Sequence, residues 1–100
     1  MPKVKDFGYA RSGDKGTNAN IGVIAYSESD YDYLKAELTR DVVKECFEPL
    51  GAKTVIRYEL DNLLALNFVI LDVLGGGGAL SLRSDAQGKA LGQTLLEIEI

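Results

Sequence analysis

The chain has 100 residues, which is the size of one domain with one hydrophobic core, so we expect a single domain over residues 1–100. Apolar residues make up 46% of it and charged residues 26%, a composition that excludes disordered, collagen-like and disulfide-scaffold classes. Its 11 Lys and Arg residues against 15 Asp and Glu residues give a net charge of −4, so the positive field that drives nucleic-acid binding is missing.

The reactive side chains are few. The chain has no histidine and a single cysteine, Cys46, which cannot form an internal disulfide. No acidic cluster has the spacing of a calcium loop, so we expect no metal and no cofactor. The N-terminus lacks the apolar core of a signal peptide, and no apolar run reaches the roughly 20 residues that span a bilayer. These observations predict a cytoplasmic protein without membrane or nucleic-acid partners.

The first part of the chain predicts a hairpin. Residues 3–10 alternate loosely between apolar and polar positions, which indicates a strand. The segment RSGDKGTN that follows is rich in turn residues and is expected to be a long loop. Residues 19–26, ANIGVIAY, then read as a second strand, antiparallel to the first.

Residues 30–50 carry apolar residues at four-residue spacing, which predicts an amphipathic helix. Ser27 and nearby polar residues offer N-caps, and Thr39 sits where a second N-cap would sit. We therefore expect a short helix, a kink at Leu38 and Thr39, and a main helix from about residue 40 to 47. Gly51 is expected to end the segment as a left-handed cap.

The second half repeats the hairpin-and-helix pattern. Residues 54–60 predict a half-exposed strand, residues 61–62 a turn, and residues 66–74 a central apolar strand. Asp85 is a candidate N-cap for a last helix with Leu91 and Leu95 on its buried face, and the final LEIEI can end that helix or form an edge strand. The order β-β-α-β-β-α predicts an α+β, two-layer sandwich in which a four-stranded, mainly antiparallel sheet carries two helices on one face.

The first candidate site is the polar segment at 11–20. Its glycines let backbone N–H groups converge, a guanidinium can bind an oxyanion bidentately, and a lysine adds a point charge. The alternative is a structural hairpin loop with an internal ion pair. The candidate ligand-binding or interface residues here are Arg11, Ser12, Gly13, Asp14, Lys15, Gly16, Asn18 and Asn20.

The second candidate site follows the predicted central strand. A strand, four glycines and a helix start form the general arrangement that presents amides to phosphate, although no known phosphate signature matches. The glycines equally permit a bulge or close subunit packing. The candidate residues here are Gly75, Gly76, Gly77, Gly78, Arg83, Asp85 and Gln87.

No catalytic residue is identified. Without histidine, proton transfer would fall to Asp14, Lys15, Asp85, Lys89 or a tyrosine with a shifted pKa. A domain of this size has little volume for an enclosed pocket. The sequence therefore favours binding or assembly over catalysis by this chain alone.

The same two segments carry a family resemblance. ARSGDKGTNANIGVIA near the start and LGGGGALSLRSDAQGKALGQTLLEIEI at the end resemble the AtuA-like, ferredoxin-fold domain of acyclic terpene utilisation proteins. In that family the domain occurs fused behind a larger domain or as a separate small chain, and this sequence resembles the separate form. The resemblance implies a ferredoxin-like fold in the broad sense and assigns no reaction.

Two functions follow from the residues and the resemblance together. The leading hypothesis is an accessory or assembly domain that forms a homo-oligomer or docks on a large AtuA-like subunit. Both glycine-rich segments would then lie at one end or edge of the sheet and form the contact surface. The alternative is a small-molecule anion site, for a CoA phosphate or a carboxylate, that contributes to an acyl-CoA or terpenoid catabolic enzyme.

Overall fold

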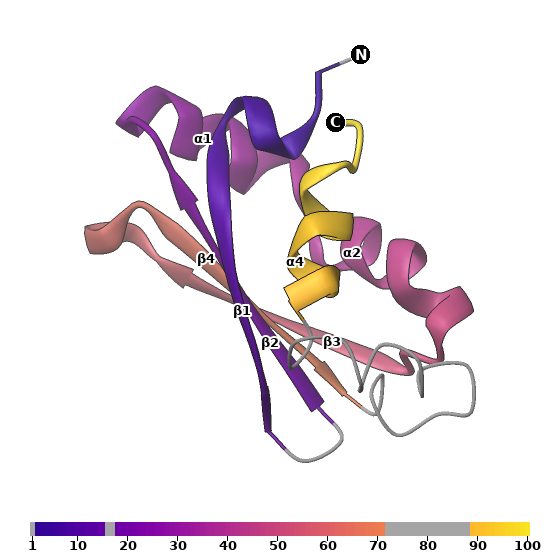
Figure 1. Ribbon diagram of the computed structural model, residues 1–100. Coiled ribbons are helices and arrows are strands. Elements are labelled where there is room, and N and C mark those ends of the chain that lie inside the picture. Colours follow the sequence, from indigo (N-terminus) through magenta and orange to yellow (C-terminus); the bar gives the residue numbers. More distant parts are fainter. Residues whose placement is uncertain (1, 16–17, 72–88) are drawn as a thin grey trace.

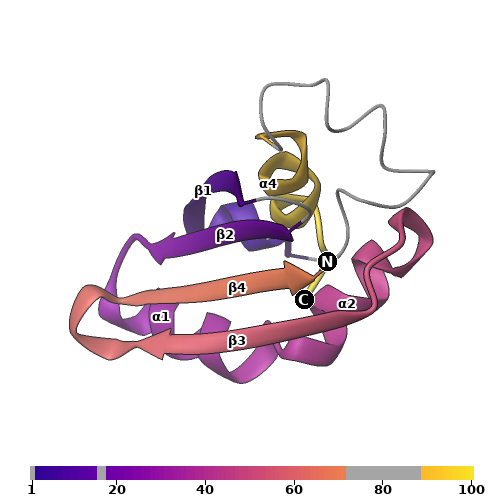
Figure 2. The same ribbon diagram turned by 90° about the horizontal axis from the view of Figure 1, so that it is seen from below.

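The computed structural model describes residues 2–15, 18–71 and 89–100 (Figure 1). The described strands form one four-stranded antiparallel sheet in the order β1-β2-β4-β3. Helices α1, α2 and α4 gather on one side of this sheet, as Figures 1 and 2 show. The predicted α+β sandwich is therefore confirmed.

The first hairpin starts later and runs further than its sequence predicts. Strand β1 spans Gly8–Lys15 and β2 spans Asn18–Ala25, paired in register from Gly8 opposite Ala25 to Lys15 opposite Asn18. The predicted strand at 3–10 is wrong at its start, because Val4–Asp6 form a 3₁₀ turn that places Val4 in the core. The predicted loop at 11–18 is also wrong at residues 11–15 and at Asn18, which pair along the β1–β2 ladder; residues 16–17 lie outside the described ranges.

The first helical segment is split as predicted. Helix α1 spans Glu28–Glu37 and α2 spans Arg40–Phe47. The Ser27 Oγ accepts a hydrogen bond from the Asp30 N–H at 3.1 Å, and the Thr39 Oγ1 accepts one from the Val42 N–H at 3.2 Å. These caps confirm the break before Thr39. A 3₁₀ turn at 48–50 follows, and Gly51 ends it with φ 99°, the predicted left-handed cap.

The second hairpin lies in the other half of the sheet. Strand β3 spans Thr54–Leu60, a 3₁₀ turn spans Asp61–Leu63, and β4 spans Ala65–Leu71. Leu64, at φ 51°, turns the chain into β4. Because β2 and β3 both pair antiparallel with β4, they run parallel to each other with β4 between them.

The described part of the last helix, α4, spans Lys89–Leu96. The residues after α4 do not form the edge strand that the sequence allowed. They make only an isolated bridge, between Glu99 and Lys3. The Val4 N–H donates to the Ile98 carbonyl at 3.0 Å, and the Ile100 N–H donates to the Pro2 carbonyl at 2.9 Å. Both ends of the chain therefore lie side by side (Figure 1).

The core fills the space between the sheet and the helices. Helix α4 packs over β1, α1 contacts β2, and α2 lies over β3. The largest fully buried side chains come from both layers, and those of the strands all lie on the helix side: Phe47, Phe68, Ile21, Leu34, Leu38, Leu66, Ile70, Leu91 and Leu95. The opposite face of the sheet has no described helix over it (Figure 2).

Candidate functional site

The first predicted site lies on a strand, so its residues are divided between two faces. Successive side chains of a strand point to opposite sides, which places Arg11 and Gly13 on the helix-free face. Ser12 faces the helices, since a Cβ built on Gly92 of α4 would lie 3.1 Å from its Oγ. An extended strand turns its N–H groups alternately to either side, so these residues do not form the expected backbone nest.

Of the other predicted site residues, only some lie within the described ranges. Asn18 and Asn20 lie on β2, and Asn20 is exposed on the helix-free face opposite Gly13. Asp14 and Lys15 are placed as the last residues of β1. The remaining predicted residues lie outside the described ranges: Gly16, Gly75, Gly76, Gly77, Gly78, Arg83, Asp85 and Gln87.

Strands β1 and β4, which precede the Gly16 position and the second predicted segment, end at the same end of the sheet. Strands β1 and β4 both pair antiparallel with β2, so both end on the side where β2 begins. Strands β1 and β4 are not neighbours, because β2 lies between them. The two segments would meet most directly if these strands were adjacent. The last described residue of β4, Leu71, pairs with Thr54 of β3.

The helix-free face of the sheet carries a groove, which is the candidate site. Its volume is about 660 Å³, within the roughly 300–1,000 Å³ range of small-molecule sites. It extends from the middle of β1 and β2 across β4 to the β3–β4 turn. Its lining is mostly apolar and consists of Arg11, Ser12, Gly13, Asn20, Gly22, Ile24, Leu60, Leu63, Ala65, Leu66 and Asn67.

The groove exists because small residues occupy the middle of the face. The strand register aligns Arg11, Gly22, Asn67 and Tyr58 in one row across the four strands. A Cβ built on Gly22 would meet nothing closer than the Asn67 Oδ1 at 3.7 Å. The sheet is therefore hollowed at Gly22, with a guanidinium on one side of it and an amide on the other.

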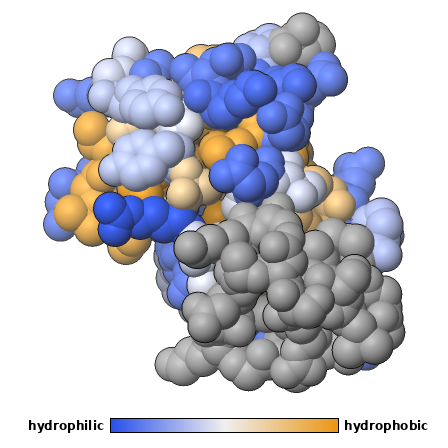
Figure 3. Space-filling model, in the orientation of Figure 1, coloured by the Kyte–Doolittle hydropathy of each residue, from blue (hydrophilic) through white to orange (hydrophobic). Residues whose placement is uncertain are grey.

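The rim of the groove is apolar on the β3 side. Outward-facing Ile56, Tyr58 and Leu60 are 37%, 49% and 38% exposed, and Leu63 in the adjoining turn is 62% exposed. Figure 3 shows hydrophobic surface at the left of the molecule, where the β3–β4 turn lies in Figure 1. Large side chains of this kind on an open face are typical of a contact surface.

Most groove residues were not among the sequence predictions. Ile24, Leu60 and Leu63 carry no motif, and only the register of the sheet brings them together with Asn67. The sequence of β3 does carry a signal for an apolar outer face, because every second residue from Ile56 to Leu60 is large and apolar. The sequence alone does not say which face is buried, because the other set of positions holds the apolar Val55 and then the charged Arg57 and Glu59.

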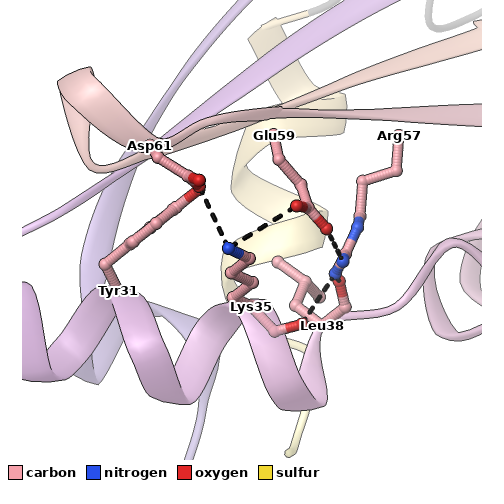
Figure 4. Close-up of polar contacts among 6 residues, drawn as sticks. All are labelled: Tyr31, Lys35, Leu38, Arg57, Glu59 and Asp61. Carbon is pink, nitrogen blue, oxygen red and sulfur yellow. Dashed lines mark hydrogen bonds and ion pairs between the residues drawn. The ribbon is translucent and has the colours of Figure 1, made fainter.

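A second polar cluster lies on the helix side of β3 (Figure 4). The Tyr31 hydroxyl donates to the Asp61 Oδ1 at 2.5 Å, and the Lys35 Nζ lies 3.2 Å from the same oxygen. Lys35 also pairs with Glu59 at 3.6 Å, and the Arg57 Nη2 donates to Glu59 at 2.6 Å. The cluster ties α1 to β3 and to the turn after it.

Arg57 completes the end of α1. Its Nη1 donates to the Lys35 carbonyl at 2.9 Å and to the Leu38 carbonyl at 3.0 Å. The last carbonyls of a helix have no partner within the helix, so this guanidinium satisfies them at the break between α1 and α2. Arg57 therefore has a structural role.

The pKa shifts in this cluster hold each group in its ordinary charge state. Burial and the hydrogen bond to Asp61 raise the pKa of Tyr31 to about 12. The hydrogen bonds from Tyr31 and Lys35 lower the pKa of Asp61, and the bond to Asp61 raises the pKa of Lys35. A general acid or base works best with a pKa near the operating pH, so this cluster is built for stability and not for proton transfer.

Other reactive groups offer no site among the described residues. Cys46 is half-buried on α2, and burial raises the pKa of its thiol, which disfavours the nucleophilic thiolate. No group of three or more potential metal ligands gathers in the described ranges. Within the same ranges, no helix has the length and apolar character needed to cross a bilayer.

Comparison with known proteins gives one result. A family model described as the AtuA ferredoxin-like domain matches residues 2–100. No curated protein and no solved structure matches the chain. The family model thus spans the sheet, the groove and both predicted segments.

Proposed function

The chain belongs to the AtuA ferredoxin-like domain family, and we propose that it is an accessory assembly domain whose helix-free sheet face docks on another subunit. The partner is a large AtuA-type protein or a second copy of the chain. The proposal draws on the resemblance to a family in which this domain accompanies a larger one.

The observation that carries the proposal is the inverted polarity of β3. A water-facing side of an antiparallel sheet normally carries polar residues. Here the outward positions are Ile56, Tyr58 and Leu60, whereas Arg57 and Glu59 lie on the helix side. Exposing large apolar residues while charges face the helices is unfavourable unless another surface covers the face.

A charge placed on this face tests the proposal. Tyr58→Lys should weaken the complex by about tenfold or more, because tyrosines at interface centres often contribute the most binding energy. Light scattering after gel filtration measures self-association, and co-purification with a co-expressed large AtuA-type subunit measures docking. Tyr58 is half exposed, so the fold should persist, which circular dichroism checks.

Glu45→Lys is the matched control, since Glu45 is exposed on α2 and far from this face in the fold. It should leave both complexes unchanged. A chain that stays monomeric and ignores the large subunit contradicts the proposal. So does a complex that Tyr58→Lys leaves intact.

A second candidate function is a small anionic ligand site that contributes to an acyl-CoA or terpenoid catabolic enzyme. The specific observation in its favour is Arg11, which lines an otherwise uncharged groove. The groove is open on one side, so a docked subunit would cover a ligand held in it. The two functions are therefore compatible.

A further inference from the structure

Charge along the groove is distributed unevenly. Arg11 is the only ionisable side chain among the described residues that line it. None of the described hydrogen bonds or ion pairs involves Arg11. The amide of Asn20, opposite Gly13, lies at the same end, whereas Asn67 lies on the other side of Gly22 and the far end is formed by Leu60 and Leu63. The groove thus has a cationic, hydrogen-bonding end and an apolar end.

The floor between these ends is open. Gly22 and Ala65 present no side chain larger than a methyl group, and nothing lies within 4 Å of a Cβ built on Gly13. From β1 to β3 the groove crosses three strand spacings of about 4.8 Å each. That distance is the length of a medium-chain acyl group.

We propose that this groove binds a monocarboxylate with an apolar tail of medium length. The carboxylate pairs with the Arg11 guanidinium, and the tail lies over Gly22 and Ala65 toward Leu60 and Leu63. This assignment rests on the second candidate function and names its ligand class. One guanidinium matches one carboxylate bidentately, whereas the several phosphates of a nucleotide need more cations than the described lining contains.

Titration of the ¹⁵N-labelled chain with octanoate tests the assignment by NMR. The amide signals of Gly13, Gly22 and Asn67 should shift together and saturate. Octan-1-ol, which lacks the charge, and acetate, which lacks the tail, should each bind at least about tenfold more weakly. Signals from α2 should not move.

Variants locate the two ends of the ligand. Arg11→Met should weaken octanoate binding by about tenfold or more, and Arg11→Lys should restore part of it because it keeps the charge but loses the fork. Gly22→Val should abolish binding by filling the floor, and Gly22→Ala serves if the valine variant does not fold. Arg40→Met, on the exposed surface of α2, is the matched control and should bind normally.

The possible failures are distinct. Absence of octanoate binding, or binding that Arg11→Met leaves unchanged, overturns the assignment. If CoA or phosphate binds in an Arg11-dependent way while octanoate does not, the ligand class is wrong but the anion-site function stands. If no ligand binds and the subunit complex depends on Arg11, the guanidinium is an interface contact and only the assembly function survives.

Discussion

At the scale of single residues, two glycines of β1 have opposite surroundings. A Cβ built on Gly8 would lie 2.4 Å from the Ile24 carbonyl oxygen and 3.2 Å from the Ala25 Cα. Both are backbone atoms of β2, which cannot move aside without breaking the ladder. Around Gly13, on the same strand, nothing lies within 4 Å. The first glycine is thus required by packing, and the second is not.

Replacing each glycine by alanine should separate these roles. Gly8→Ala should lower the free energy of unfolding by about 1–3 kcal/mol, the usual cost of overpacking. Gly13→Ala should leave it unchanged or raise it by up to about 1 kcal/mol, because alanine loses less backbone entropy on folding. Urea unfolding curves measure both. Equal effects of the two substitutions would contradict the packing argument.

At the scale of the elements, β3 and α1 depend on each other. The charged residues of β3 face the helices, where Arg57 caps α1 and Glu59 pairs with Lys35. The turn after β3 supplies Asp61, which accepts hydrogen bonds from Tyr31 and Lys35 of α1. The charges of β3 and its turn therefore hold α1 in place and leave the apolar residues of β3 on the outer face.

This link predicts a pH dependence. The pKa of Asp61 is lowered in the folded state, so its ionised form stabilises the fold above its unfolded pKa of about 3.9. That stabilisation should disappear as the pH falls through the folded pKa. Accordingly, the native chain should be more stable than Asp61→Asn at pH 6, and the difference should shrink from about pH 4 downward.

Urea midpoints of both chains between pH 2.5 and 6.5 measure this effect. In a Tyr31→Phe background, Asp61 lacks the donor that lowers its pKa most, so its folded pKa lies closer to the unfolded value. The stability difference at pH 6 should then be smaller, and its loss should be complete at a higher pH. A difference between the native chain and Asp61→Asn that is constant over this range would show that the carboxylate does not stabilise the fold through its charge.

At the scale of the whole molecule, the topology is that of a circularly permuted ferredoxin-like domain. The strand order is β1-β2-β4-β3, and the described elements run β-β-α-β-β-α if the split first helix counts once. Starting at β2 and closing α4 onto β1 gives β-α-β-β-α-β with the same sheet, which is the ferredoxin-like motif. The hydrogen bond from Ile100 to Pro2 places the two ends within reach of such a closure.

A circular permutant tests this description. Joining Ile100 to Pro2 through a short glycine linker and opening the chain between Gly16 and Thr17 should preserve the far-UV circular dichroism spectrum and cooperative unfolding. The control permutant, opened between Ile21 and Gly22, should not fold, because it breaks β2 between its two ladder partners. A first permutant without cooperative unfolding would contradict the description.

The sequence by itself determined the elements wherever local chemistry decides them. Neighbouring residues set the caps at Ser27 and Thr39 and the left-handed Gly51, and each was predicted correctly. The apolar strand predicted at 66–74 is confirmed over its described part, which ends at Leu71. The α+β class and the family were also predicted correctly, the latter through the two glycine-rich segments.

Only the tertiary structure decided where β1 runs and what it presents. Arg11 to Lys15 have turn composition, yet they are extended because β2 offers them a ladder, an interaction that no local pattern records. In the same way, Arg57 faces the helices because the end of α1 needs a donor, which leaves Tyr58 outside. The groove follows from the register that sets Gly22 between Arg11 and Asn67, and register is a property of paired strands and not of any one segment.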